Sequence, residues 1–380
     1  MMGQGGAKVD AGFMRRALKL AEQGVGETNP NPPVGCVLVR DGRVVGEGFH
    51  ARAGWPHAEA VALEAAGERA RGATAYVTLE PCAPNPAKRT PPCAPRLIGA
   101  GIRRVVLGAR DLNPNVRGKG ARLLRSAGIR VVEGVCAIEA RRLTQHFNTA
   151  MENGRPFITL KAGMTLDGRI ATASGESRWI TSPAQRRAAR SLRRLFDGVL
   201  VGIGTALADD PILLPRPRTG RPFSRIVLDS RLRLPPGSKL VQTAKGNPLI
   251  VVCVKASPRR RRDLEARGVV VIEAGSRGAR VALPRALRAL FERGVMSLMV
   301  EGGSETIGGF VGQGLFDEFV MFRAPLLLGG RASRPLVGGD GPGRLSEAVR
   351  VRRASVATSA TLRYGLDDPA GLEVEVYERR

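Results

Sequence analysis

Residues 56–82, PHAEAVALEAAGERARGATAYVTLEPC, place a helix and a strand one after the other. Alanine, valine and leucine recur at helical spacing over residues 56–66, whereas residues 73–82 contain β-branched residues and end in Pro-Cys. His57 and Glu59 stand where the helix begins, and Cys82 stands where the strand ends. This helix–strand pair predicts an α/β fold with reactive side chains at the ends of its elements.

The flanking sequence continues the alternation of helices and strands. An amphipathic pattern predicts a helix over residues 11–23, and residues 34–48 predict a hairpin around Asp41-Gly42. Further along, we expect strands over 103–111 and 129–134, and helices over 93–101 and 120–128. The first half therefore predicts a three-layer α/β domain.

A short polar stretch, MENGRP at 151–156, separates this domain from a second one. Short apolar runs beyond it are typical of buried parallel strands, and Arg-rich helices are expected between them. We expect strands over residues 157–164, 197–204, 224–230, 248–254, 268–274 and 297–303. The sequence thus predicts two domains, residues 1–150 and residues 154–380.

Composition limits the class of protein. The chain has 380 residues and a net charge of +26, but its basic residues are scattered and only 4% of its residues are aromatic. We therefore expect no nucleic-acid partner, and we expect the positive charge to attract phosphorylated small molecules. No apolar run approaches the ~20 residues that cross a bilayer, and no secretory signal opens the chain, so we expect a cytoplasmic protein without membrane contact. Five cysteines favour free thiols or metal ligands over a disulfide framework.

The cysteines and His57 predict a catalytic zinc site. His57, Cys82 and Cys93 supply one imidazole and two thiolates, which leaves a fourth tetrahedral position for water, and Glu59 is placed to carry protons. A structural zinc site or buried thiols are the alternatives, but neither gives Glu59 a role. The remaining cysteines lie in or beside apolar strands and are expected to be buried inert thiols: Cys36, Cys136 and Cys253.

The spacing of the two cysteines indicates the subclass. Nucleic-acid and nucleoside deaminases usually have Cys-x-x-Cys, whereas ten residues, APNPAKRTPP, separate Cys82 from Cys93. Together with PNPPVGCVLV (30–39), GEGFHARAGWPHAE (46–59) and RTPPC (89–93), this loop makes the chain resemble the bifunctional riboflavin-biosynthesis deaminase/reductases. The resemblance implies a cytidine-deaminase-like first domain that deaminates 2,5-diamino-6-(5-phosphoribosylamino)pyrimidin-4(3H)-one.

Residues matching the family's motifs take on the corresponding roles. The resemblance implies that Asn31 and His50 contact the pyrimidine and that Arg89 contacts the phosphate. The sequence departs from the family pattern in two places. Residues 83–85 (Ala-Pro-Asn) replace the start of Ser-His-x-Gly, and Pro33 replaces a common Asn. The histidine contact of that loop is therefore absent.

The stretch LKAGMTLDGRIATASGESRWITS (160–182) resembles the opening of the family's reductase domain, which implies a dihydrofolate-reductase-like α/β fold. Thr181 or Ser182 is expected to cap a helix that begins at Pro183. Glycines follow two strands at 202–204 and 302–303, each before a helix, which predicts a cofactor cleft at the carboxyl ends of the sheet.

In the reductase domain the resemblance implies NADPH-dependent reduction of the ribosyl chain to ribityl, with Lys161 assisting the chemistry of the sugar. It implies NADPH contacts from Trp179, Thr205, Asp209, Ser230 and Gly303. It implies substrate contacts from Ser177, Arg193, Arg216 and Glu301. Arg231 is a candidate partner for the 2′-phosphate of the cofactor.

The expected cofactors are one zinc ion and NADPH, the expected partner is a phosphorylated pyrimidine, and a homo-oligomer is expected. Two alternatives stay open from the residues alone. One is an RNA or nucleoside deaminase with an appended domain, and the other is a basic scaffold with structural zinc.

Overall fold

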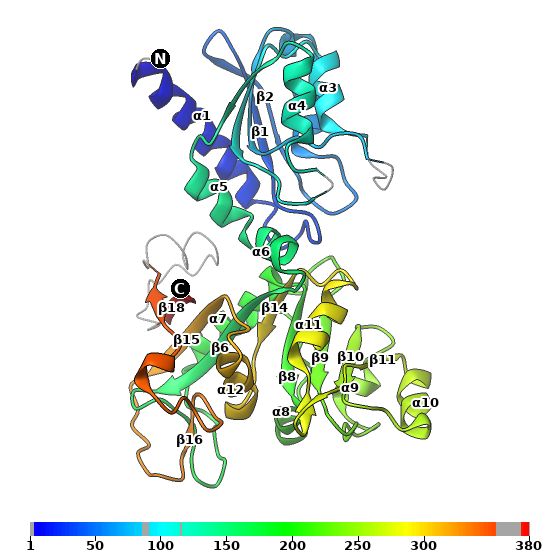
Figure 1. Cartoon of the computed structure of the whole chain (residues 1–380), viewed down its shortest axis with the longest axis vertical. Helices are drawn as coiled ribbons and strands as arrows, with labels where there is room; N and C mark the ends of the chain where they lie inside the picture. Colours follow the sequence, from blue (N-terminus) through cyan, green and yellow to red (C-terminus); the bar gives the residue numbers. More distant parts are fainter. Residues whose placement is uncertain (1–3, 86–90, 115, 355–373, 380) are drawn as a thin grey trace. The chain divides into compact units, whose positions relative to one another are not determined.

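The structure is a computed structural model that describes residues 4–85, 91–114, 116–354 and 374–379. The chain divides into two compact units, Met1–Gly154 and Arg155–Arg380, each with its own sheet and core (Figure 1). Among the described helices, none combines the length and apolar composition that crossing a bilayer requires.

The first unit is built on a five-stranded sheet. Its strands are β1 (Gly35–Arg40), β2 (Arg43–Phe49), β3 (Thr74–Leu79), β4 (Arg104–Ala109) and β5 (Arg130–Glu133). Their order across the sheet is β2-β1-β3-β4-β5, with the hairpin and the β1–β3 pair antiparallel and the rest parallel. The turn of the hairpin needs positive φ at both Asp41 (50°) and Gly42 (74°), as expected for an Asp-Gly turn.

Helices cover both faces of this sheet. They are α1 (Gln4–Glu22), α2 (Ala58–Ala66), the 3₁₀ turn η1 (Gly67–Ala70), α3 (Cys93–Gly99), α4 (Lys119–Ser126), α5 (Ala137–Leu143) and α6 (Gln145–Asn153). Neighbouring residues of β1 point to opposite faces, so Leu38 packs in the core with α2, α3 and α4 while Val37 packs in the core with α1 and α5. The predicted three-layer α/β arrangement is confirmed.

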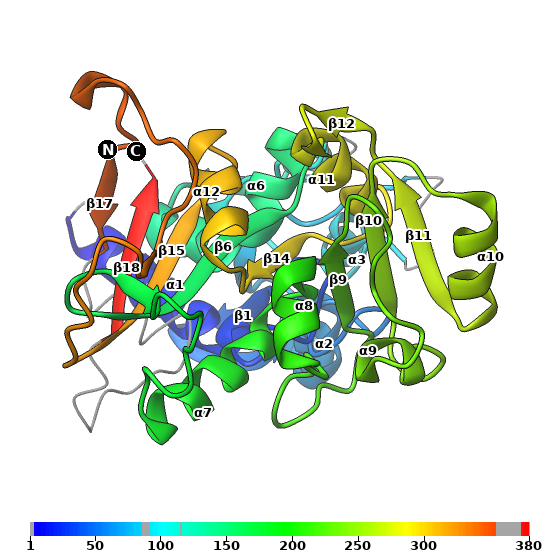
Figure 2. The ribbon, with the colours of Figure 1, turned by 90° about the horizontal axis from the view of Figure 1, so that it is seen from below.

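The second unit contains a nine-stranded sheet. The strands of this unit are β6 (Phe157–Thr165), β7 (Arg169–Ala171), β8 (Gly198–Gly202), β9 (Ser224–Leu228), β10 (Leu249–Cys253), β11 (Val269–Glu273), β12 (Ser276–Arg277), β13 (Arg280–Val281), β14 (Ser297–Val300), β15 (Glu318–Ala324), β16 (Arg334–Pro335), β17 (Val351–Arg353) and β18 (Val374–Arg379). The main sheet has the order β11-β10-β9-β8-β14-β6-β15-β18-β17, and Figure 2 shows its strands side by side. Its strands β11, β10, β9, β8, β14, β6 and β15 run parallel, as predicted for the apolar runs, and β18 and β17 close one edge antiparallel.

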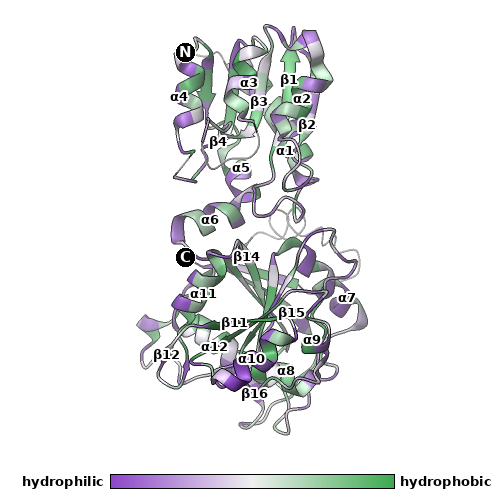
Figure 3. Cartoon of the chain, turned by 90° about the vertical axis from the view of Figure 1, so that its right-hand side faces the viewer, coloured by the Kyte–Doolittle hydropathy of each residue, from purple (hydrophilic) through white to green (hydrophobic). Residues whose placement is uncertain are grey.

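Helices also cover both faces of the second sheet. They are α7 (Pro183–Leu192), η2 (Arg193–Leu195), α8 (Ile203–Asp209), α9 (Lys239–Gln242), α10 (Pro258–Ala266), α11 (Leu283–Phe291), α12 (Ser304–Gly312) and η3 (Leu345–Glu347). Leu200 of β8 shares a core with α11 and α12, whereas Val199 and Val201 share the opposite core with α8, α9 and α10. Figure 3 shows the same division, with hydrophobic strands inside and strongly hydrophilic residues on α10.

Several predicted boundaries were wrong in detail. The strand predicted over 73–82 ends at Leu79, so Cys82 lies in the following loop, and the strand predicted over 297–303 ends at Val300. Ser182, not Thr181, caps α7: its hydroxyl accepts a hydrogen bond from the Gln185 N–H, and the Gln185 side chain accepts one from the Ser182 N–H.

Candidate functional site

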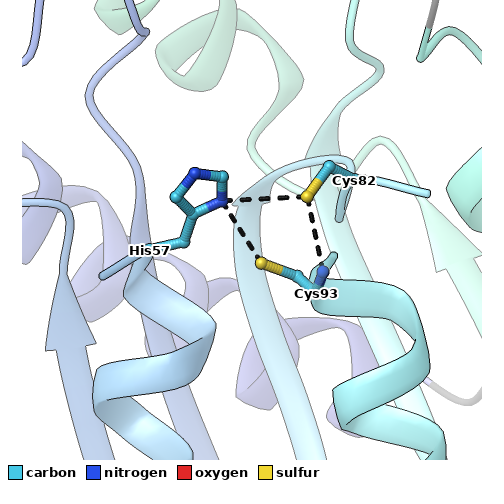
Figure 4. A group of neighbouring side chains, drawn as sticks. All are labelled: His57, Cys82 and Cys93. Atoms are coloured by element: carbon cyan, nitrogen blue, oxygen red, sulfur yellow. Dashed lines mark hydrogen bonds between the residues drawn. The ribbon is translucent and has the colours of Figure 1, made fainter. Parts of the chain in front are cut away.

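The predicted metal ligands meet in the first unit. His57 Nδ1 lies 3.3 Å from Cys93 Sγ and 3.8 Å from Cys82 Sγ, and all three ligand atoms lie within 4.8 Å of one another (Figure 4). His57 is the N-cap residue of α2 but its side chain makes no capping bond, and Cys93 is the first residue of α3. Both helices therefore direct their N-terminal ends toward the group.

The donor atoms fit a zinc ion. Ligands at tetrahedral zinc, with Zn–S near 2.3 Å and Zn–N near 2.0 Å, lie about 3.6 Å from one another. The observed N···S distances of 3.3 and 3.8 Å bracket that value, and imidazole and thiolate are donors that zinc prefers. The Cys93 backbone N–H donates to Cys82 Sγ over 3.3 Å, which stabilises negative charge on that sulfur.

Electrostatics also favour a cation at this position. The hydrogen bond with Cys82, together with burial and the negative charge of Glu59, raises the pKa of the Cys93 thiol. Two thiolates and a carboxylate thus repel one another in a buried space, and a divalent ion removes that repulsion.

Glu59 lies beside the ligand group in the first turn of α2, with 3% of its surface exposed. Burial raises the pKa of Glu59, and the Cys82 sulfur adds to this effect while His57 opposes it. A raised carboxyl pKa suits a group that must both accept and release a proton near neutral pH.

A tight packing contact positions the loop that carries Cys82. Buried Glu80 accepts hydrogen bonds from the Gly118 N–H (2.9 Å) and the Ala121 N–H (3.1 Å) at the start of α4. Gly120 lies so close that an added Cβ would stand 1.8 Å from the Pro81 carbonyl oxygen. The metal-ligand loop is therefore fixed against the N-terminus of α4.

The residues predicted to contact the pyrimidine form a hydrogen-bonded chain. His50 is 2% exposed, and its Nδ1 lies 3.1 Å from the Pro56 carbonyl oxygen, so Nδ1 carries the proton. His50 Nε2 then accepts from the Asn31 amide nitrogen at 3.3 Å. The contacts of both residues with substrate stay predictions, but the structure gives His50 a second role in orienting Asn31. Arg89 lies outside the described residues.

In the second unit a cavity of about 1010 Å³ opens where β8 and β14 meet the helices that follow them. It brings together most of the predicted cofactor residues, and Ser177, predicted to contact substrate, lines it too. Trp179 is 66% exposed and is not among the described lining residues, while Arg233 lines the cavity and Arg231 does not. The predicted residues in the lining are Ser177, Thr205, Asp209, Ser230 and Gly303.

A second cavity of about 620 Å³ is lined by residues 210–216, by side chains of α7 and η2, and by the first residue of α9. Its lining includes Arg193 and Arg216, which were predicted to contact substrate, and three cations that the sequence did not single out, namely Arg190, Arg218 and Lys239. Since five cations and a single carboxylate line it, the cavity suits a phosphate group.

Glu301 joins the predicted catalytic lysine to this cavity. Its carboxylate receives Arg193 Nε at 2.6 Å and lies 3.5 Å from Lys161 Nζ. Burial opposes ionisation, but the charges of Arg193 and Lys161 prevail and lower the pKa of Glu301 to about 2. Glu301 is therefore a permanent anion at neutral pH that positions both cations.

Sequence reasoning missed Gly338 and Gly339, which line the larger cavity from a loop far along the chain. Their only signal was the glycine run at 338–343. Cys136 was expected to be buried but is partly exposed at the start of α5, while Cys36 and Cys253 are buried as predicted.

Comparison with known proteins gives matches for both units of the chain. A family model described as the RibD C-terminal domain matches residues 156–361, and one described as the cytidine and deoxycytidylate deaminase zinc-binding region matches residues 7–109. Riboflavin biosynthesis protein RibD of Aquifex aeolicus is 44% identical over 352 residues, which cover 92% of this chain and 95% of that protein. RibD of Escherichia coli is 42% identical and covers 85% of this chain and 89% of its own length.

Solved structures are similar over the whole length. A structure of Acinetobacter baumannii RibD superimposes with a TM-score of 0.84 at 36% identity, covering 98% of this chain and 99% of that one. The deaminase/reductase of Thermotoga maritima gives a TM-score of 0.81 at 34% identity, again covering 98% and 99%.

Proposed function

The chain belongs to the RibD family of riboflavin biosynthesis proteins, and from that premise we propose that unit Met1–Gly154 performs the deamination and unit Arg155–Arg380 the reduction. The enzyme is bifunctional and uses zinc and NADPH. One observation carries this assignment: among the described residues, the His-Cys-Cys group with a buried glutamate beside it lies in the first unit. The rival, a nucleic-acid or nucleoside deaminase, accounts for neither the second unit nor the long loop between the cysteines.

In the deaminase unit His57, Cys82 and Cys93 would hold the zinc ion, which when bound lowers the pKa of water into the neutral range. Glu59 is the proton carrier, since its carboxyl is buried beside the ligand group and burial raises its pKa. It takes a proton from water and gives one to the amino group that leaves as ammonia. Asn31, oriented by His50, is proposed to hold the pyrimidine, and Arg89 to bind its phosphate.

In the reductase unit NADPH supplies hydride when bound, so the chain has to align the sugar with the cofactor. We propose that the larger cavity holds the cofactor, contacted by Thr205, Asp209, Ser230 and Gly303, with Trp179 at its margin. The proposed substrate residues are Ser177, Arg193, Arg216 and Glu301. Lys161, held by Glu301, is placed to give a proton to the sugar oxygen as the ring opens.

The remaining proposals concern partners and location. We expect a cytoplasmic homo-oligomer that binds no nucleic acid. The densest basic run supports the last point, because Arg260 and Arg261 on α10 are paired with Asp263, Glu265 and Glu273. Titration of the protein with tRNA, together with light scattering, tests both points.

The decisive experiment follows both steps in one sample. Purified protein is expected to release ammonia from 2,5-diamino-6-(5-phosphoribosylamino)pyrimidin-4(3H)-one and, once NADPH is added, to oxidise one NADPH per ammonia. A zinc chelator is expected to stop ammonia release while NADPH oxidation continues with the deaminated pyrimidine supplied directly. Ammonia release from tRNA or a free nucleoside, with none from the diaminopyrimidine, would establish the rival.

A further inference from the structure

Arg225 lies on β9 and is completely buried. Its guanidinium donates to Thr243 Oγ1 at 2.7 Å and to the carbonyl oxygens of Ile212 and Leu240 at 3.3 Å each. It also donates to the Asn247 carbonyl oxygen. Four acceptors from three separate segments of the chain therefore meet at one buried side chain.

A buried cation without an anion is costly, so this arrangement requires a reason. Among the described residues no carboxylate forms an ion pair with Arg225. Burial lowers the pKa of Arg225 to about 10, which still leaves the side chain charged at neutral pH. The positive charge is compensated by neutral carbonyl and hydroxyl oxygens. An apolar side chain could fill this space instead, just as Val227 fills the next position on the same face of β9.

One acceptor residue, Ile212, lines the smaller, cationic cavity, and two others lie in or next to α9, whose first residue, Lys239, also lines it. Ile212 lies in the wall formed by residues 210–216, while Leu240 lies in α9 and Thr243 directly follows it. From its buried position Arg225 thus joins the 210–216 segment to α9 and the residue that follows it.

The wall formed by residues 210–216 needs such support. Leu213 has φ of 57°, a conformation that is unfavourable for a residue with a large side chain. The carbonyl before it, on Ile212, is held by Arg225, and the carbonyl after it, on Leu214, is held by Arg193 at 3.0 Å. Arg216 follows directly in the same segment, so its placement depends on how this strained stretch is held.

We propose that Arg225 is a positioning residue of the reductase, which holds the strained 210–216 segment against α9 so that Arg216 and Lys239 face the substrate's phosphate. This inference rests on the proposed function, in which that cavity receives the phosphorylated end of the substrate. Arg225 itself touches neither substrate nor cofactor.

The test compares matched variants of the full-length enzyme. In Arg225→Met we expect KM for the deaminated pyrimidine to rise about tenfold, because displaced charges bind phosphate poorly, while KM for NADPH and the rate of ammonia release stay within about twofold. Arg225→Lys keeps the charge but reaches fewer acceptors, so its KM is expected to lie between the two. Thr243→Val removes the 2.7 Å acceptor together with the bonds that its hydroxyl donates to the Lys239 and Leu240 carbonyl oxygens within α9, and it is expected to raise KM about threefold with the fold retained.

Val227→Ala is the control for a general loss of stability. Val227 is as buried as Arg225 and on the same face of β9, but it belongs to an apolar core, so this variant is expected to lower Tm without changing KM. An equal rise of KM in Val227→Ala, or an unchanged KM in folded Arg225→Met and Thr243→Val, would overturn the inference.

Binding of inorganic phosphate separates this inference from the proposed function. We expect phosphate to raise the Tm of the wild type and of Val227→Ala, and to raise that of Arg225→Met far less. If the wild type oxidises no NADPH with the pyrimidine, the proposed function fails, and the phosphate shifts still decide whether Arg225 positions the cavity. Equal phosphate shifts in all variants contradict the role of Arg225.

Discussion

Replacement of Gly120 by alanine should weaken zinc binding, although the substitution is chemically small and lies outside the ligand set. Gly120 is buried in the first turn of α4, and an added Cβ would stand 1.8 Å from the Pro81 carbonyl oxygen. Ordinary contact begins at 3.4 Å, so the two backbones must separate by 3.4 − 1.8 = 1.6 Å. The clashing atom is backbone, which cannot rotate away as a side chain would.

That displacement passes directly to a metal ligand, because Cys82 follows Pro81. Zinc–ligand distances are met within about 0.2 Å, which is far less than the required movement. We therefore expect zinc affinity to fall at least about tenfold, by analogy with displaced or weakened ligand support. Unfolding should also become easier by about 1–3 kcal/mol, the usual cost of overpacking a core.

The assay measures zinc content after dialysis against a competing chelator, ammonia release, and NADPH oxidation with the deaminated pyrimidine. Gly12→Ala is the matched control, since Gly12 lies in α1 with nothing near its added Cβ, and helix propensity predicts that it stabilises the unit by up to about 1 kcal/mol. NADPH oxidation should be unchanged in both variants. Wild-type zinc affinity and ammonia release in Gly120→Ala would refute the packing argument.

Three further outcomes are expected. Glu59→Gln should keep zinc, as measured by metal analysis, and lose ammonia release, while NADPH oxidation survives; parallel loss of both activities in folded protein contradicts separate sites. Although burial opposes its ionisation, Glu301 has its pKa lowered from 4.5 to about 2 by Arg193 and Lys161, so its stabilising contribution is complete above about pH 4.5 and is lost as pH falls toward 2. Denaturant titrations should show this slope in wild type and a flatter one in Glu301→Gln. The chain has two tryptophans, so NADPH should quench fluorescence in Trp55→Phe, where Trp179 alone remains, and quenching that persists in Trp179→Phe argues against a cofactor contact there.

The metal ligands could be predicted because each is marked locally. His57 and Glu59 stand at the start of an apolar helical pattern, and Pro-Cys follows a β-branched run, so the ends of regular elements identify the ligands without knowledge of distant contacts. The parallel sheet of the second unit was likewise visible in its apolar runs. Strand ends were less certain: the polar residues after Leu79 and Val300 lie in loops because their side chains turn to partners outside the ladder, as Glu80 does with Gly118.

The remaining features depend on contacts between distant segments, which leave no local pattern. Arg225 is one of 60 lysines and arginines in the chain, and in the sequence it reads like any exposed arginine at the start of a strand. Only the folded chain shows that acceptors from residues 212, 240, 243 and 247 surround it. The role of Gly120 could not be predicted either. From the sequence alone a glycine in a helix only lowers helix propensity, and the structure shows that Gly120 is needed because the Pro81 carbonyl packs against it.

The two units each hold groups of like charge close together, negative in the first unit and positive in the second. The first gathers two sulfurs and the Glu59 carboxylate in a buried space, where a bound cation offsets the cost of their negative charge. The second gathers five cations around a cavity in which Asp210 pairs with Lys239, and an anionic ligand can balance the remaining positive charge. In each case the surrounding backbone, fixed by Glu80 in one unit and by Arg225 in the other, holds like charges together before the ligand arrives. Because ligand and scaffold lie within one unit in each case, loss of either site should leave the other intact.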